Sequence, residues 1–344
     1  MKNFKNIFTL ILVMTLFFTS CNSDDDNSGY EEPIIETPQP DGEALQQNFL
    51  DNRGESIQTG TIEAETGGSI YGEQGTELVF EPNAFLDGNG DPVTGDVTIE
   101  LIESYKKSDM LLMNMPTIGR RSNGDIETLI SGGEFFVNAT KNGENLQLDG
   151  SFRLLAPSLN DEFDVDMKLF NGIDDDCNDG EKCVGPDGNI VWEEDEQNGL
   201  EPAEVMGPAG QYVWGYSTYV AQFGWTNIDK WFNDPRPKTT VYVDVPEGYN
   251  KDNCAVYLSY DGEPTALASM DMWDPELEMF TEHYGLIPIG LEVHFIFISQ
   301  VDDEWNYAIH SATIEEDHVE CFCDPLEIES ITEEELTTLI NDLP

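Results

Sequence analysis

Two acidic stretches of the sequence carry residue types and spacings that can bind calcium. In the first, Asp174, Asp176 and Asn178 alternate, and Asp179 and Gly180 follow directly. Oxygen ligands at alternate positions can wrap a calcium ion in a tight loop. Asp179 and Gly180 stand one position later than an EF-hand loop requires, so a solvated acidic loop without metal is the alternative interpretation.

In the second stretch, Asp87, Asn89 and Asp91 have the same alternate spacing. Pro92 stands where such a loop needs glycine, and no glutamate occupies the position of the bidentate twelfth ligand. A β-turn made of Asp, Gly and Asn explains the same residues without a metal. Calcium is therefore the cofactor that the sequence indicates, with plain turns as the alternative.

The cysteine spacing predicts a disulfide inside the first acidic stretch. Cys177 and Cys183 close a short loop, and export would permit disulfides to form. Cys254 could join either Cys321 or Cys323 and connect two strands, which would leave one thiol over. Metal binding by the C-x-C pair is less favoured, because no histidine or cysteine stands at a recognised zinc spacing from it.

The sequence lacks the motifs of the common catalytic classes. It contains no G-x-S-x-G elbow, no P-loop and no G-x-G-x-x-G after a strand. With 69 acidic residues, the presence of carboxylate pairs carries no information about glycosidase chemistry. We therefore expect a protein that is not an enzyme.

An aromatic-dense stretch keeps a glycan ligand open as an alternative. An exposed row of rings beside acids would pack on the apolar faces of sugars, whereas most aromatic side chains of a β-sandwich fill its core. The aromatic residues of this stretch are Trp214, Tyr216, Tyr219, Phe223, Trp225, Trp231 and Phe232.

The net charge restricts the possible partners. The 344-residue chain has a formal net charge of −54. Phosphate backbones and anionic lipid headgroups repel such a chain, which excludes nucleic acid as a partner and requires lipid for any membrane attachment. Such an acidic chain attracts cations instead.

The N-terminus has the order of regions found in a secretory signal. Lys2 and Lys5 precede an apolar run over residues 7–18, and small residues then end at Cys21. The run is shorter than the roughly 20 residues that a membrane-spanning helix needs, and it fits an h-region. This order resembles a bacterial lipobox, although Phe18 stands where that family prefers leucine.

The lipobox resemblance implies that residues 1–20 are removed and that Cys21 carries the lipid. The polar run after it resembles the acidic export signal of Bacteroidota-type lipoproteins, which implies an outer-membrane lipoprotein facing the cell exterior. A solvated acidic spacer is the alternative. The residues of this predicted signal are Ser23, Asp24, Asp25 and Asp26.

Short alternating runs separated by Gly, Asn and Asp predict an all-β fold. We expect two β-sandwich-like antiparallel domains on a disordered, lipidated N-terminal tether, with a short C-terminal helix, since length favours about 150 residues per domain. The predicted segments are the signal peptide 1–20, the acidic tether 21–44, the N-terminal β domain 45–160, the acidic inter-domain segment 161–208, the C-terminal β domain 209–325 and the helix 326–344.

Local patterns add detail to this fold. Asn142-Gly143 predicts a hairpin turn, and so does Asp302-Asp303. No convincing amphipathic helix of 12 or more residues is expected between residues 45 and 160. Thr332 and Glu335 have capping-box spacing, which predicts the start of the closing helix.

Residues 67–101 resemble the opening of a ZU5-type β domain. The matching features are Gly67-Gly68, Gly75-Thr76, the strand at 78–80 and the residues Pro82, Asn83 and Ala84. ZU5 domains are interaction modules without catalytic residues. The resemblance therefore implies a binding role.

We expect a non-catalytic cell-surface binding or interaction module whose partner is a surface protein or glycan. A glycan-binding or glycan-processing component is the alternative function. A deep acidic and aromatic groove would favour a glycan, and a flat apolar patch or an exposed sheet edge would favour a protein partner.

Overall fold

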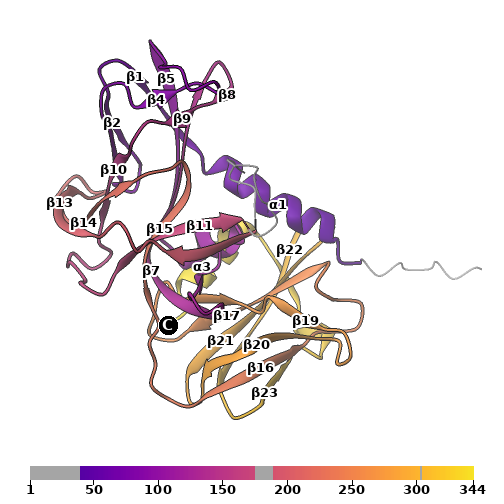
Figure 1. Ribbon diagram of the computed structural model, residues 1–344. Helices are drawn as coiled ribbons and strands as arrows, with labels where there is room; N and C mark the ends of the chain where they lie inside the picture. The colour runs from indigo at the N-terminus through magenta and orange to yellow at the C-terminus, as the bar shows by residue number, and fades with distance from the viewer. Residues whose placement is uncertain (1–38, 175–188, 303) are drawn as a thin grey trace, which may run out of the picture. The chain divides into compact units, whose positions relative to one another are not determined.

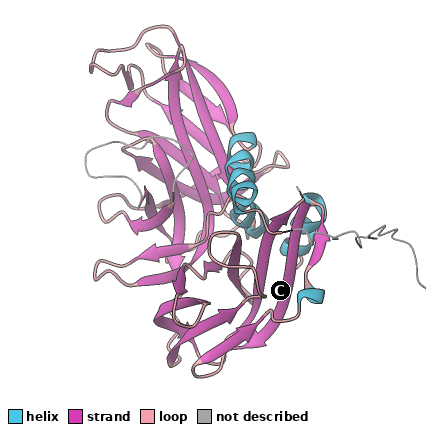
Figure 2. Cartoon of the chain, turned by 90° about the vertical axis from the view of Figure 1, so that its right-hand side faces the viewer, coloured by secondary structure: helices cyan, strands magenta, loops and turns pink. Residues whose placement is uncertain are grey.

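The computed structural model describes residues 39–174, 189–302 and 304–344 of the chain (Figure 1). Of these described residues, 50% lie in strands and 11% in helices. The sheets are mainly antiparallel, and a short helix closes the chain (Figure 2). The predicted mostly β fold is confirmed.

A first sheet is built around the long strand β7 (Ile126–Lys141). Its order is β1-β5-β7-β15-β11-β12-β6, and β8 also pairs with β7. The other strands of this sheet are β1 (Gln58–Glu63), β5 (Asp96–Ser104), β6 (Ile118–Arg120), β8 (Glu144–Asn145), β11 (Lys168–Asp174), β12 (Ile190–Glu194) and β15 (Gly224–Trp231).

Part of this sheet closes on itself, which the sequence did not predict. β6 pairs with β12 and also with β7, so β7, β15, β11, β12 and β6 form a closed circuit of hydrogen-bonded neighbours. Large side chains fill a circuit of this size, as in a small barrel. Buried aromatic residues from these strands pack together there: Phe136, Phe170, Trp192 and Trp225.

A second sheet packs against β1, β5 and β7 through a shared core. Its order is β13-β14-β10-β3-β2. Val97, Ile99 and Leu101 of β5 are fully buried in this core, on the face that their alternation predicts. The strands of this sheet are β2 (Gly68–Tyr71), β3 (Glu77–Phe80), β10 (Phe152–Pro157), β13 (Glu201–Met206) and β14 (Tyr212–Val220). The strands β4 (Phe85–Leu86) and β9 (Gln147–Leu148) form a separate two-stranded sheet.

Strand pairing does not follow the predicted boundary between residues 208 and 209. β14 pairs with β10, and β15 pairs with β7, so both strands belong to sheets of the predicted N-terminal domain. Residues 39–344 also belong to one compact unit. The aromatic-dense stretch looked like a new block because it follows a long acidic segment, but its apolar faces complete the earlier sheets.

Two further sheets enclose another core, to which Ile118, Ile126 and Val191 of the first sheet also contribute. Their orders are β19-β20-β16-β23 and β18-β17-β21-β22-β24, and β16 and β23 run parallel. The strands are β16 (Lys238–Asp244), β17 (Cys254–Tyr260), β18 (Leu267–Ser269), β19 (Met272–Asp274), β20 (Met279–Pro288), β21 (Glu292–Val301), β22 (Glu304–Thr313), β23 (His318–Cys321) and β24 (Glu329–Ile331).

Helix α1 (Gly42–Glu55) corrects two expectations. It begins inside the predicted tether 21–44, and it is a helix of 14 residues where none was expected. Asp41 caps it by accepting a hydrogen bond from the backbone N–H of Ala44. The helix is mostly polar, and its buried contacts come from Leu45 and Phe49, so its weak periodicity hid it.

Three helices lie beside one another (Figure 2). α2 (Lys107–Leu112) contacts both α1 and α3 (Glu333–Asn341). Arg53 of α1 donates hydrogen bonds to the carbonyls of Met113 and Asn114 just after α2, at 2.7 and 3.0 Å. These bonds satisfy carbonyls that a helix end leaves without partners.

Two of the predicted local patterns are confirmed, and the strands pair as Val301 with Glu304 on either side of the predicted Asp302-Asp303 turn, of which Asp303 lies outside the described residues. Asn142 and Gly143 join β7 to β8 with φ of 53° and 83°, as a tight hairpin of this sequence requires. Thr332 and Glu335 form a capping box at the start of α3. A 3₁₀ turn at η1 (Pro325–Glu327) precedes β24.

Candidate functional site

The predicted calcium residues Asp87, Asn89 and Asp91 form a turn after β4. Asp87 Oδ1 accepts hydrogen bonds from the backbone N–H groups of Asn89 and Asp91, at 2.8 and 3.0 Å. These bonds hold the pKa of the Asp87 carboxyl below its usual range. One carboxylate oxygen thus already serves the turn itself. Calcium binding at this turn stays a prediction.

The other sequence-predicted sites lie mostly outside the described residues. Asp174 is described as the last residue of β11, opposite Ile190 of β12. The calcium site and disulfide predicted just after it stay predictions, as does the N-terminal lipid and export signal. The predicted residues outside the described ranges are Cys21, Ser23, Asp24, Asp25, Asp26, Asp176, Cys177, Asn178, Asp179 and Cys183.

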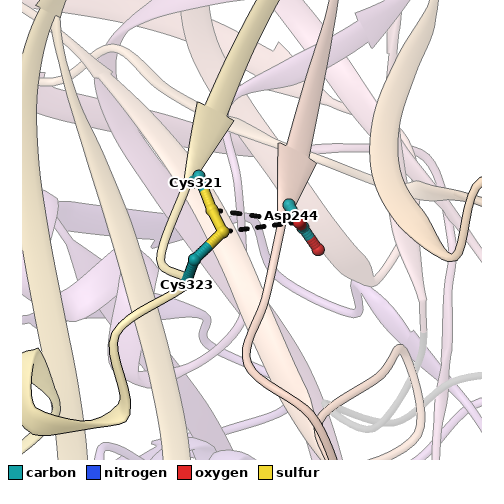
Figure 3. Close-up of side chains that lie close together, drawn as sticks. All are labelled: Asp244, Cys321 and Cys323. Atoms are coloured by element: carbon teal, nitrogen blue, oxygen red, sulfur yellow. Dashed lines mark hydrogen bonds between the residues drawn. A yellow bond between two sulfur atoms is a disulfide. The ribbon is translucent and has the colours of Figure 1, made fainter.

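A sulfur and carboxylate cluster lies at the end of the parallel pair β16 and β23 (Figure 3). Cys321 and Cys323 form a disulfide, with Cα atoms 5.1 Å apart. Asp244 Oδ2 lies 3.8 Å from the Cys321 sulfur and 3.4 Å from the Cys323 sulfur. Metals bind thiolates, so the oxidised pair leaves Asp244 as the one anionic ligand of this cluster.

The sequence left the pairing of Cys254, Cys321 and Cys323 open, and the Cys321–Cys323 disulfide excludes a bond from either of them to Cys254. Cys254 is a buried free thiol that donates a hydrogen bond to the carbonyl of Asn250, at 3.2 Å. Burial raises the pKa of this thiol far above its usual range. The Cys254 side chain is part of the core between the last two sheets. Cys321 and Cys323 are two residues apart, and the turn between them brings their sulfur atoms together.

A polar groove of about 650 Å³ lies where α1, α2 and α3 meet the strands β1, β2 and β5. Among the described residues that line it, every charged side chain is acidic: Glu55, Glu73, Glu103, Asp109 and Glu333. The uncharged lining residues are Asn52, Ser56, Ile57, Gln58, Thr59, Tyr71, Gln74, Leu112, Met113 and Thr337. Such a groove repels anions and offers many hydrogen-bond acceptors.

Glu103 fixes one wall of the groove. Its Oε1 accepts a hydrogen bond from the backbone N–H of Thr76, and its Oε2 accepts from the backbone N–H of Gln74 and from Gln58 Nε2, each at 2.9 Å. Gly72 in the same turn has no side chain, and a Cβ there would lie 2.2 Å from the Glu103 carboxylate. Glu103 therefore holds the turn between β2 and β3 in place.

Two other acids of the groove come from the helices. Glu333 Oε2 accepts hydrogen bonds from Trp305 Nε1 at 3.2 Å and from Asn52 Nδ2 at 3.4 Å. Asp109 is half-buried, and burial raises the pKa of its carboxyl, while the Ser108 hydroxyl donates to its Oδ1 at 3.2 Å. The carboxylates of Glu103, Asp109 and Glu333 thus come from β5, α2 and α3, and each has different hydrogen-bond donors.

Exposed aromatic side chains lie at the edge of the groove and on the second sheet. Tyr71 lines the groove and is 64% exposed, and Tyr212 is 70% exposed. The pKa of Tyr71 is raised, first by its hydrogen bond to Glu77 and also by the nearby Tyr212. Trp214 and Tyr219 are exposed as well. The predicted aromatic stretch therefore divides, since Tyr216 and Trp225 are buried.

Sequence reasoning missed this groove. Its lining comes from four separate segments, at residues 52–59, 71–74, 103–113 and 333–337, so no motif contains it. No protein-family model and no curated protein sequence matches this chain. In the part of the chain that the structure describes, no helix has the length and apolar composition needed to cross a membrane.

Proposed function

We propose that the chain is a non-catalytic, lipid-anchored protein of the outer cell surface and that its acidic groove binds a glycan. The observation that carries this proposal is the composition of the groove: carboxylates, amides and hydroxyls with exposed Tyr71 and, among described lining residues, no basic side chain. Carboxylates and amides can hydrogen-bond sugar hydroxyls, and an aromatic face can pack on a sugar ring.

The charge of the groove narrows the class of glycan. Five carboxylates line it, and the whole chain carries a formal charge of −54. Like charges raise the free energy of binding an acidic polymer. The proposed ligand is therefore a neutral or amino-bearing glycan.

Two of the five groove acids already serve the fold. Glu103 accepts three hydrogen bonds, from Gln58, Gln74 and Thr76. Glu333 Oε2 accepts two hydrogen bonds from side chains of the fold. These two acids are therefore less available to a ligand than the other acids of the groove.

A basic segment of a surface protein is the second candidate ligand. The acidic lining favours it, because Lys and Arg side chains would pair with carboxylates that have no basic residue beside them among the described lining residues. Such binding weakens steeply as salt rises, whereas glycan binding through hydrogen bonds and ring packing changes little. Salt dependence therefore separates the two candidates.

The test is a binding screen of the purified protein against neutral, amino-bearing and acidic oligosaccharides and a lysine-rich peptide, followed by calorimetry. Tyr71→Ala should weaken binding of the glycan about tenfold, the effect of losing an aromatic contact of about 1.4 kcal/mol. Tyr219→Ala is the matched control, because this exposed tyrosine does not line the groove.

Each outcome of the screen has a clear meaning. Glycan binding that Tyr71→Ala weakens and Tyr219→Ala leaves unchanged supports the proposal. Salt-sensitive binding of the peptide alone moves the proposed ligand to a basic protein segment. Failure of every oligosaccharide to bind, or equal losses in both variants, rejects the groove as a glycan site.

A further inference from the structure

Glu134, in the middle of β7, is a buried carboxylate without a hydrogen-bond partner. Its side chain has no solvent exposure. In the described part of the chain, neither Oε1 nor Oε2 has a hydrogen-bond partner. A buried ionised group in this state is costly, because burial removes its hydration and nothing replaces it. The proposed glycan groove does not explain this side chain.

Unpartnered oxygens of neighbouring strands lie around Glu134. Ser104 of β5 and Asn227 of β15 are its direct partners in the two flanking strands, so the three side chains share one face of the sheet. Asp229 follows on β15. The Ser104 hydroxyl and Asp229 Oδ1 also lack a hydrogen bond of normal geometry among the described residues, although the Ser104 hydroxyl is close enough to Glu134 to lower the pKa of its carboxyl.

A β-bulge and two short hydrogen-bond links organise these side chains. Between the pairs Glu134–Asn227 and Ser131–Asp229, β7 contains one more residue than β15. Ser131 Oγ donates to Asn227 Oδ1 at 3.3 Å, and Asn227 Nδ2 donates to Asp229 Oδ2 at 2.6 Å. Asn227 therefore helps to orient Asp229, together with Ser131 and the backbone of Gly132, while Asp229 Oδ1 has no hydrogen bond of normal geometry among the described residues.

Two nearby cationic side chains donate hydrogen bonds to neutral groups. Lys107 Nζ donates to the Ser259 hydroxyl at 2.6 Å, and Arg53 donates to the carbonyls of Met113 and Asn114. Burial raises the pKa of Glu134, and the charge of Asp229 raises it further, although Arg53 and the Ser104 hydroxyl act in the opposite direction. The pKa of the Glu134 carboxyl therefore stays raised in spite of Arg53 and Ser104.

We propose that Glu134, Asp229 and Ser104 bind one calcium ion inside the fold, with Asn227 as the positioning residue. Two carboxylates and a hydroxyl are hard oxygen ligands, which select hard divalent cations. Calcium accepts irregular sets of six to eight oxygens, so water can complete a set to which the chain contributes these side chains. The site is separate from both acidic loops that the sequence predicts.

The acidic groove lies near this site. Asp109 lines the groove, and its charge is close enough to raise the pKa of Glu134. An acidic groove concentrates cations at its surface. The proposal does not depend on the identity of the ligand that the groove binds.

The test is thermal unfolding of the purified full chain, first treated with EDTA and then supplied with calcium or magnesium, together with a measurement of bound calcium by mass spectrometry. At 100 times the dissociation constant, binding to the folded state should raise the melting temperature by at least about 4 °C. One tightly held calcium per chain is expected. Glu134→Met should abolish both effects, and Ser104→Ala should weaken them.

Asp87→Asn and Asp174→Asn are matched controls, because they remove acids of the two sequence-predicted loops and should keep the full calcium effect. The proposal is overturned if calcium does not shift the wild-type melting temperature. It is also overturned if Glu134→Met keeps the shift while either control loses it. An equal shift with magnesium overturns the assignment to calcium. Ser104→Ala and the bound-calcium measurement on wild type still decide the question if Glu134→Met does not fold.

Discussion

Glu103 and Glu134 are buried glutamates on the neighbouring strands β5 and β7, and their carboxylates have opposite surroundings. Glu103 accepts three hydrogen bonds, from Gln58, Gln74 and Thr76. Both oxygens of Glu134 lack any partner within the described residues. The comparison shows that burial of an acid does not reveal its role. The donors that the chain supplies to the acid distinguish a structural carboxylate from one that is free to bind a ligand.

The difference follows from the position of each residue in the fold. Glu103 lies beside a turn, where backbone N–H groups are free of the β ladder and can point at a carboxylate. Glu134 lies in the middle of a sheet, between Ser104 and Asn227, where the N–H groups of the flanking strands are used in strand pairing. Only side chains or a bound ion can satisfy an acid in that place.

The largest effect is expected from removing the satisfied carboxylate. Glu103→Ala should lower the free energy of unfolding by about 3–4 kcal/mol, because the backbone N–H groups of Gln74 and Thr76 lose a charged partner. Urea unfolding measures this loss. The exposed Glu144→Ala on β8 is the control and should change stability by less than about 0.5 kcal/mol. A loss below about 1 kcal/mol for Glu103→Ala would remove the contrast with Glu134.

Lys107 is an intermediate case, a buried charge with one neutral partner. Burial lowers its pKa from 10.5 to about 8. Below pH 8 the amine is charged in both states, so burial costs stability in full, and that cost disappears as pH rises from 8 to 10.5. Lys107→Met should therefore stabilise the fold by up to about 3 kcal/mol at pH 7.

This pH dependence gives the measurement. Urea unfolding of wild type and Lys107→Met at pH 7, 9 and 10.5 should show a difference in free energy of unfolding that shrinks as pH rises. The difference between the two proteins cancels most contributions of other titrating groups. A difference that stays constant across this range would contradict the assignment of the lowered pKa to Lys107.

Removing the Glu134 carboxylate should change stability less than removing the Glu103 carboxylate, and it should stabilise the fold. In EDTA, Glu134→Met should raise the free energy of unfolding by about 1–2 kcal/mol, because an apolar side chain of similar volume replaces an unpaired buried charge. Glu103→Met should lower stability under the same conditions. If both variants are destabilised in EDTA, the chain satisfies Glu134 without an ion.

The smallest effect is expected at Ser104, the chain neighbour of Glu103. Its hydroxyl lacks a hydrogen bond of normal geometry in the described structure, so Ser104→Ala in EDTA should change stability by less than about 0.5 kcal/mol. Calcium affinity should fall about tenfold, as expected when the metal loses a neutral ligand. Thr76→Val is the comparison, because the Thr76 hydroxyl pairs with Tyr105 and its loss should cost about 1 kcal/mol.

Sequence patterns predicted the local features of the fold and missed those that depend on distant partners. Phe135 and Val137 alternate with Phe136 along β7, as in a strand, and the structure buries the two faces in different cores. The turn at Asn142-Gly143 was predicted correctly because its backbone conformation restricts the residue types. Neither pattern says which strand pairs with β7.

The candidate sites were harder to predict for the same reason. Asp87 and its neighbours gave a predicted calcium site because residues that are close together in sequence can be recognised as a motif. The groove joins four separate segments, and Glu134 is one acid among 69 until strand pairing brings Ser104 and Asp229 to it. Helix α1 was missed because most of its residues are polar, and its docking residues Leu45 and Phe49 form only a short apolar pattern.

The pairing of β7 with β15 has a consequence for how the chain acquires its structure. Val137 of β7 pairs with Gly224 of β15, so the central strand of the first sheet stays open until residues far along the chain have been synthesised. Contacts between residues distant in sequence form slowly, and apolar strands are prone to aggregate until their partner strands have paired with them. Folding of this sheet therefore requires β15, and a chain that ended before β15 would leave this edge of β7 unpaired.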